Sequence, residues 1–437
     1  MRTTIARWTA VLCAAATLGA ACGSGDGDGV AADQDGVSAV AVGDRQGPSA
    51  DPSAAGRAVT AFGGTLFAAV RAGADDPDAN LTISPASVAV ALAMLEPGAT
   101  GDAATQLRRV LAIDDPGTYH ASMNALEQDL EARVPDPVAD DDGDEEQDPG
   151  EVTVRLANAA YLQQGYPFES AYLETIGANY GPALNEVDFR ADPDAVAHAI
   201  NAFVAGATND RIPELVADGV ISPDTVLALV NALYLKASWL ESFEADATAD
   251  APFTRADGTE VTVPMMRGAS GASSQGAGWR GAEKPYVGGL AAQFILPDEG
   301  RFDEVAADLG RVVAEFDANR TVGAELSVPR FEVRANRQLD PALRALGLTA
   351  PYEPGHLLGI AADDRLVLSK VIHETWVAMD EEGTEAAAAT VALMVAVSAP
   401  VEPPRPLTLD RPFLYRIYDQ RSGATLFLGQ VTDPTAG

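Results

Sequence analysis

The stretch that decides the fold is Glu381-Glu382-Gly383-Thr384-Glu385-Ala386-Ala387-Ala388-Ala389-Thr390. A run without charge follows it and reaches Val401. An acidic start, a single glycine and then almost only small side chains suit a segment that must slide into a crowded β-sheet, where bulky or charged side chains are costly to bury.

A buried or membrane helix is the alternative interpretation of the same residues, because alanine has the highest helix propensity. The run from 386 to 401 is shorter than the about 20 apolar residues that cross a bilayer. Its second half carries Val391, Val395 and Val397 and is followed by prolines at 400, 403, 404 and 406, which favours extended backbone. Taken alone, the run fits helix and strand equally well, and the rest of the chain decides.

The composition is that of a globular protein without a basic surface. The 437 residues, 47% of them hydrophobic, suffice for one large domain or for two to three ordinary ones. The formal net charge is −35 and the isoelectric point is near 4.2. Because such a chain repels phosphate backbones, nucleic acid is excluded as a partner.

Residues 1–21 have the pattern of a signal peptide, with a basic start at Arg2 and Arg7 and a short apolar core at 11–21. The sequence Leu18-Gly19-Ala20-Ala21-Cys22 resembles a bacterial lipobox. It predicts an exported lipoprotein at the cell surface, held to the membrane only through a lipid on Cys22. An ordinary secretory peptide, which gives a secreted extracellular protein, is the alternative. The other cysteine, Cys13, lies inside the removed peptide, so we expect no disulfide.

Two further segments are predicted to lack regular structure. Residues 22–56 are rich in Gly, Asp, Ala and Ser, so burial cannot offset the entropy of ordering them, and we interpret them as a flexible acidic tether. Residues 135–150 form a second acidic run, which we expect to be a surface loop. Its carboxylates approach the spacing of a calcium loop, but Glu145 stands where that loop needs glycine, so no metal site is predicted there.

The chain beyond the tether contains clear helix and strand signals. Ser84-Pro85 predicts a helix start, the apolar residues after it keep helical spacing, and Gly98 predicts the end. Residues 156–161 and 227–239 are near-continuously apolar, which indicates strands of a large sheet covered on both faces. Asp257-Gly258 predicts a turn that leads into a strand at 261–266.

Taken together and in order, these motifs resemble those of the serpin family from about residue 57 to 434. The resemblance rests on the hinge 381–390 and on Asn80-Leu81-Thr82-Ile83-Ser84-Pro85-Ala86-Ser87, Val230-Asn231-Ala232-Leu233-Tyr234-Leu235-Lys236, Leu409-Asp410-Arg411-Pro412-Phe413-Leu414-Tyr415 and Gly429-Gln430-Val431-Thr432-Asp433-Pro434. It implies an α+β fold with one serpin domain over 57–437. In that fold a mixed central β-sheet, further sheets and surrounding helices carry an exposed reactive-centre loop at about 381–406.

The resemblance also implies a conformational switch. Ser84, Ser87, Asn231 and His373 match the positions that cross-link the helix beneath the central sheet to the strands that part, and Trp239 matches the aromatic residue where the loop first enters. A polar network in a dry region is costly unless it is satisfied, so it can hold two discrete arrangements apart. Plain core packing is the structural alternative for His373 and Trp239, and it is compatible with this role.

No catalytic residue is predicted. The chain has no Gly-x-Ser-x-Gly elbow, and its histidines at 120, 198, 356 and 373 do not pair at metal-ligand spacing. No nucleophile and base stand out as a pair. We therefore expect a protein that is not an enzyme and that binds no cofactor and no metal. We also expect it to be a monomer.

The family resemblance implies an irreversible suicide-substrate inhibitor of serine endopeptidases, with cysteine endopeptidases as a further class of target. The target cleaves the loop, forms a covalent acyl complex and is distorted as the loop inserts. Alternate residues Thr384, Ala386, Ala388 and Thr390 would face one side of the sheet, and all are small. A non-inhibitory binding or chaperone-like envelope lipoprotein is the alternative.

The family's usual spacing from Glu381 places the cleaved bond between Val397 and Ser398. A small apolar residue before the bond favours an elastase-like or subtilisin-like target and disfavours trypsin-like enzymes, whose pocket acid prefers Arg or Lys. The segment from Ser398 to Pro412 is longer than is typical of the family, so Met394, Ala396 and Ala399 remain alternative positions.

Overall fold

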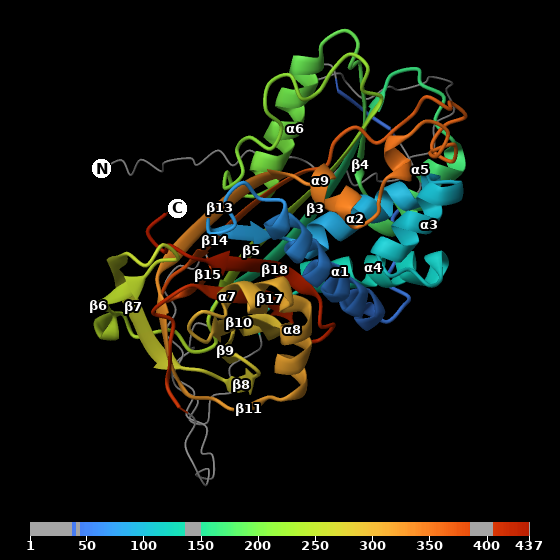
Figure 1. The fold of residues 1–437 in the computed structure, drawn as a ribbon. Coiled ribbons are helices and arrows are strands. Elements are labelled where there is room, and N and C mark those ends of the chain that lie inside the picture. The colour runs from blue at the N-terminus through green and yellow to red at the C-terminus, as the bar shows by residue number, and fades with distance from the viewer. Residues whose placement is uncertain (1–36, 41–43, 136–149, 385–404, 437) are drawn as a thin grey trace, which may run out of the picture. The chain divides into compact units, whose positions relative to one another are not determined.

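The computed structural model describes residues 37–40, 44–135, 150–384 and 405–436, and Figure 1 shows their arrangement. Several predicted features lie outside these residues. They are the signal peptide with Cys22, most of the tether, most of the acidic loop, the hinge residues from Glu385 to Thr390, and the predicted cleavage site Val397-Ser398.

A seven-stranded mixed sheet forms the centre of the fold. Its strands are, in spatial order, β1 (Ser38–Ala39), β4 (Ala183–Val187), β3 (Val152–Gln163), β5 (Leu227–Ser238), β15 (Gly383–Thr384), β14 (Ile372–Met379) and β13 (Phe331–Gln338). Strands β3 and β4 run parallel, and the other neighbours run antiparallel. The mixed central sheet that the sequence predicts is therefore present.

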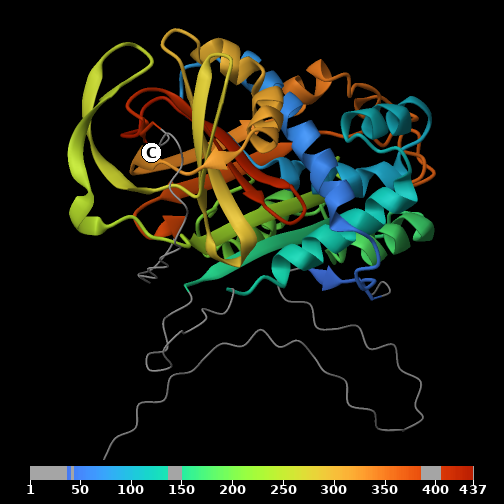
Figure 2. The same cartoon turned by 90° about the horizontal axis from the view of Figure 1, so that it is seen from below.

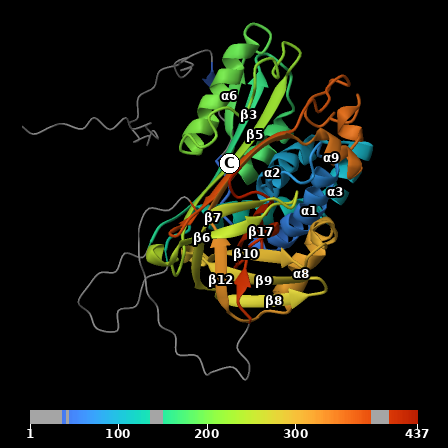
Figure 3. The ribbon, with the colours of Figure 1, turned by 60° about the vertical axis from the view of Figure 1, so that its left-hand side comes forward.

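Both faces of the central sheet are covered, which explains why its strands are so apolar. Along β5, Leu233, Leu235 and Ala237 belong to the main hydrophobic core, whereas the alternate residues Val230 and Ala232 belong to a second core. Side chains that alternate along a strand point to opposite faces. Figure 3 shows α6 (Pro193–Ala207) on one side of β3 and β5 and α2 (Pro85–Leu95) on the other.

Two further sheets complete the β-structure. One has the order β11 (Thr321–Val322), β8 (Ala272–Gly276), β9 (Trp279–Pro285), β10 (Leu290–Pro297), β17 (Phe413–Asp419), β18 (Thr425–Val431) and β2 (Leu81–Ile83). The other has the order β16 (Leu407–Thr408), β12 (Glu325–Pro329), β7 (Glu260–Ala269) and β6 (Ala249–Thr254). The predicted turn at Asp257-Gly258 joins β6 to β7, and Gly258 there has a φ of 81°, a conformation that favours glycine.

The remaining helices surround these sheets. They are α1 (Pro52–Ala72), α3 (Gly101–Val110), α4 (Pro116–Glu131), α5 (Ser170–Tyr180), α7 (Phe302–Ala307), α8 (Leu309–Ala318) and α9 (Asp340–Ala345). Helix α1 packs against α4 and α8, as Figure 2 shows. Within the described ranges, no helix is long and apolar enough to cross a membrane.

Helix α2 begins as the sequence predicts. Ser84 precedes its first residue, Pro85, and the Ser84 hydroxyl accepts a hydrogen bond from the Ser87 amide. A serine cap followed by proline is a typical helix start. A 3-10 helix continues α2 and ends at the predicted stop, Gly98. Almost every side chain of α2 is buried, as expected of a helix that lies beneath a sheet.

The predicted tether, residues 22–56, extends too far toward the C-terminus. Ser38 and Ala39 pair with β4, and α1 begins at Pro52 behind an Asp51 cap. Arg45 donates hydrogen bonds to Asn124 and to the buried Glu127, 82 residues further along the chain. Long-range contacts therefore order a segment whose own composition does not.

Candidate functional site

The site lies in the central sheet, between β5 and β14. In the part of the chain that the structure describes, these two strands do not pair with each other, and only the short β15 lies between them. Gly383 pairs with Ser238, and Thr384 pairs with Ala237 on one side and with Met379 on the other. Among the described residues, the sheet therefore contains a slot for one strand between β5 and β14, and β15 fills it at one end.

The first hinge residues are already inside the sheet, whereas the predicted loop begins at residue 381. A Cβ atom on Gly383 would lie 2.1 Å from the Ala237 carbonyl oxygen, so only glycine fits there. Thr384 is 2% exposed, and its hydroxyl lies 2.6 Å from the Tyr286 hydroxyl. Residues 383 and 384 are therefore part of the central sheet and not of an exposed loop, which corrects the predicted start at 381.

Trp239 holds the chain where it enters the sheet. Its indole nitrogen donates to the Asp380 carbonyl at 3.0 Å, and its amide donates to the Glu382 carbonyl at 2.8 Å. The indole ring stacks on Tyr286, with 4.0 Å between ring centroids and 9° between planes. Trp239 is thus at the entry point that the sequence predicts, and it contacts the hinge directly.

Glu381 anchors the start of the hinge to Arg330, which lies between β12 and β13, and to Thr248, which precedes β6. Arg330 donates to both carboxylate oxygens at 2.7 Å, and the Thr248 hydroxyl donates at 2.7 Å. Burial alone would raise the pKa of Glu381, but the hydrogen bonds from Arg330 and Thr248 outweigh it and leave the pKa lowered. The Arg330 side chain is half exposed, so this ion pair orients the hinge more than it stabilises the fold.

The other predicted switch residues gather at the unfilled part of the slot. The Ser84 amide of α2 donates to His373 Nε2 of β14 at 2.9 Å. Burial lowers the pKa of His373 to about 4, so the ring is neutral at pH 7 and carries its proton on Nδ1. Ser87 and Asn231 line the same cavity as His373. The structure thus brings all four residues to one place.

Asn231 makes a different contact from the one that the resemblance implies. Its amide nitrogen donates to the Asn158 side chain of β3 at 2.6 Å, and its buried Oδ1 atom has no partner among the described residues. Asn158 donates in turn to Glu127 at 2.9 Å, and Arg45 donates to the same carboxylate oxygen at 2.8 Å. Burial raises the pKa of Glu127 to about 8.

The contacts of Tyr286, Arg330 and Glu127 were missed by sequence reasoning. A usable signal existed only for Glu127, because its partner Asn158 is a polar residue inside an apolar strand and requires a hydrogen-bond partner. Tyr286 and Arg330 come from distant segments and carry no local signal. Within the described ranges, no group of three or more His, Cys, Asp or Glu side chains is placed to hold a metal ion.

We expect the native state to lose stability in acid through His373. The pKa of His373 in the folded state lies below its ordinary value of 6.5. The contribution of the neutral ring to the free energy of unfolding is therefore complete above pH 6.5 and is lost as the pH falls toward 4. The loss by pH 4 is about 3 kcal/mol. His373→Gln keeps an acceptor for the Ser84 amide but does not titrate. Urea midpoints measured from pH 4 to 7 should therefore fall less steeply in the variant, and two parallel curves would contradict the assignment.

The sequence is similar to proteins of one known family. A family model described as Serpin (serine protease inhibitor) matches residues 57–434. The leukocyte elastase inhibitor of Equus caballus is 32% identical over 394 residues, which cover 86% of this chain and 98% of that protein. An uncharacterized serpin-like protein of Thermococcus kodakarensis is 31% identical over 365 residues, 82% of each chain.

Solved structures show the same fold. Human glycosylated kallistatin has a TM-score of 0.73 at 26% identity and covers 89% of this chain and 100% of its own. The thermophilic serpin tengpin in its native state has a TM-score of 0.74 at 22% identity and covers 89% of this chain and 97% of its own.

Proposed function

The chain belongs to the serpin family, and from this premise we propose that it is an irreversible suicide-substrate inhibitor of serine endopeptidases, with cysteine endopeptidases as a further class of target. The observation that carries the proposal is the slot between β5 and β14, which the hinge has entered by two residues. The unpaired edges of these strands provide a template for the residues that follow Thr384.

The register of β15 predicts where each later residue would lie after insertion. Thr384 pairs with Ala237 and Met379, so six residues further on Thr390 would lie between Asn231 and His373. Asn231 Oδ1 is an acceptor without a partner among the described residues. His373 Nδ1 carries the ring proton, and no described residue accepts a hydrogen bond from it. A threonine hydroxyl can accept from one and donate to the other. Thr390 is thus chemically matched to the position it would occupy.

The same register explains the small side chains of the hinge. Thr384 is buried, and the residues that share its face of a strand are Ala386, Ala388 and Thr390. Their neighbours on β5, Leu235, Leu233 and Asn231, belong to or border the main core. A bulky or charged residue on this face would stop insertion, and the face has none from Thr384 to Thr390.

In the proposed mechanism the target protease cleaves the loop with its own catalytic residues, and insertion of the loop into the central sheet stops the protease from completing the reaction. The protease serine attacks the carbonyl carbon of Val397 and forms an ester with it. The bond from that carbon to the Ser398 nitrogen breaks, and the serine's proton passes to the departing Ser398 amine. Insertion of residues 385 onward then competes with hydrolysis of that ester. If insertion is faster, the attached protease is distorted before water can release it.

The proposal is tested by incubating the protein with elastase-like, subtilisin-like, chymotrypsin-like and trypsin-like proteases. We expect a complex that survives boiling in detergent with the first two classes, and mass spectrometry should place the cut after Val397. A dominant cut after Arg405 would instead indicate a trypsin-like target. If every protease cleaves the loop without forming a complex, the protein is a non-inhibitory member of the family that binds other partners.

We also propose that the protein is exported as a monomer and anchored only through a lipid on Cys22. The support is the sequence pattern of residues 1–22. Cys22→Ala would then leave a protein that no longer partitions into detergent.

A further inference from the structure

A partly open cavity of about 520 Å³ occupies the unfilled end of the slot. Its floor is helix α2, with Val88, Leu92 and Leu95, and one wall is the start of β5, with Leu227 and Leu229. The volume is in the range of sites that hold small molecules.

The cavity extends beneath the sheet as well as between its strands. Leu227 and Leu229 pack against the main core, which lies on the α2 side of the sheet, whereas Ala228 packs against the second core. A ligand between α2 and the two leucines would therefore contact apolar side chains. Neighbouring strands are about 4.8 Å apart, so a slot that lacks one strand admits a slender chain but not a broad ring system.

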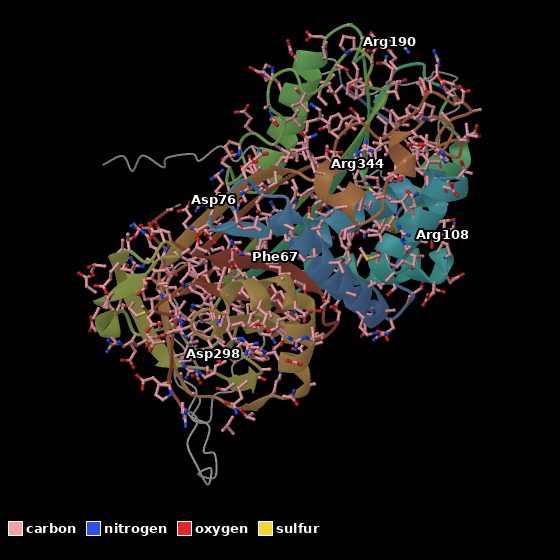
Figure 4. All side chains as sticks on the ribbon, viewed as in Figure 1. Phe67, Asp76, Arg108, Arg190, Asp298 and Arg344 are labelled. Carbon is pink, nitrogen blue, oxygen red and sulfur yellow. The ribbon has the colours of Figure 1, made fainter. Side chains whose placement is uncertain are left out.

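Two exposed cations, Arg190 and Lys370, line this cavity. Neither side chain makes an ion pair or a hydrogen bond with another described residue, although the Arg190 charge attracts the Asp188 carboxylate and helps to lower its pKa. Arg365 and Asp363 also line the cavity and pair with each other at 2.7 Å, and Asp224 is the remaining charged side chain of the lining, so the cations outnumber the carboxylates by one. Figure 4 places Arg190 among the loops at the α6 end of the fold, far from Asp298 at the opposite end.

We propose that this cavity binds a straight-chain aliphatic carboxylate, with its tail between α2 and β5 and its carboxylate facing Arg190 and Lys370. The apolar walls select a hydrocarbon tail, the narrow slot selects an unbranched one, and the two exposed cations select a negative head group. Because the register places residues 391–394 opposite 230–227, a bound tail obstructs deep loop insertion. This last consequence rests on the proposed function, whereas binding itself does not.

Binding is tested by calorimetric titration of the intact protein with dodecanoate below its micelle concentration. We expect saturable binding of one molecule per chain, and at least tenfold weaker binding of dodecyltrimethylammonium, which has the same tail and the opposite charge. The double variant Arg190→Gln/Lys370→Gln should bind dodecanoate at least tenfold more weakly. The control Arg57→Gln/Arg267→Gln removes the same charge at exposed positions outside the cavity and should bind normally.

The outcomes separate the two proposals. The carboxylate site is wrong, whatever the protein inhibits, if any one of three results is found. These are no saturable binding of dodecanoate, equally tight binding of the cationic ligand, or an equal loss of dodecanoate affinity in both double variants. A short apolar peptide that binds while dodecanoate does not would assign the cavity to a strand-type occupant instead. If dodecanoate binds, more inhibitor should be consumed for each protease trapped. If the protein traps no protease even without dodecanoate, the proposed function fails and the site remains.

Discussion

Cleavage of the loop after Val397 should raise the melting temperature of the protein by about 20 °C or more. In the part of the chain that the structure describes, two residues of β15 lie in the slot between β5 and β14. After cleavage, residues 385 onward can enter as a full strand with hydrogen bonds on both sides. At a net contribution of about 1 kcal/mol for each hydrogen bond, the new strand adds on the order of 10 kcal/mol.

Calorimetry before and after limited proteolysis measures this effect, and Thr390→Val is the matched variant. Valine has the shape of threonine but lacks the hydroxyl that would join Asn231 to His373. The cut variant should therefore gain several degrees less than the cut parent, at about 2 to 4 °C for each kcal/mol. If cut and intact parent melt together, the loop does not insert and the inhibitory mechanism is wrong.

Thr384→Arg should convert the protein from an inhibitor into a substrate. Thr384 is 2% exposed and hydrogen-bonded to Tyr286, so a guanidinium cannot remain at this position without an uncompensated charge in the core. We expect residues 383 and 384 of the variant to leave the slot while the rest of the fold, to which β15 contributes only two residues, persists. Because each 1.4 kcal/mol changes a rate tenfold, a penalty of several kcal/mol slows insertion by a factor of at least about 100.

The measurement is the number of inhibitor molecules consumed for each protease trapped, together with the mass of the cleaved loop. Thr384→Arg should be cut at the same bond and release active protease, so the ratio should rise at least tenfold. Thr384→Ser keeps the hydroxyl that contacts Tyr286 and should inhibit as the parent does. Equal trapping by the arginine variant would mean that Thr384 does not enter the sheet during inhibition.

The parts of the fold that the sequence predicts correctly depend on local patterns. Ser84-Pro85 starts α2 because a cap and a proline act within one turn, and β3 and β5 are strands because their long apolar runs need burial on both faces. The order of these motifs along the chain then identifies the family. The tether boundary was wrong because Arg45 is ordered by Glu127, 82 residues away, and no local pattern reports such a contact.

The structure brings the predicted switch residues close together, but most of their contacts could not be predicted from the sequence. His373 and Trp239 lie where the resemblance places them, since their positions follow from the order of the family's motifs. The depth to which the hinge enters depends on the width of the slot, which several distant strands set together. The link from Asn231 to Asn158 and Glu127 depends on side-chain rotamers across three elements.

The slot between β5 and β14 also affects how copies of the protein behave in concentrated solution. An ordinary sheet has two edges, but among the described residues this one has four stretches of edge backbone, on β1, on β13 and on the two strands that border the slot. Edge backbone is a template on which strands of other molecules can add. A net charge of −35 keeps such molecules apart, and added salt shortens the range of that repulsion to about 10 Å at 0.1 M. Repulsion between the negatively charged molecules therefore opposes the addition of strands from other copies to the slot between β5 and β14.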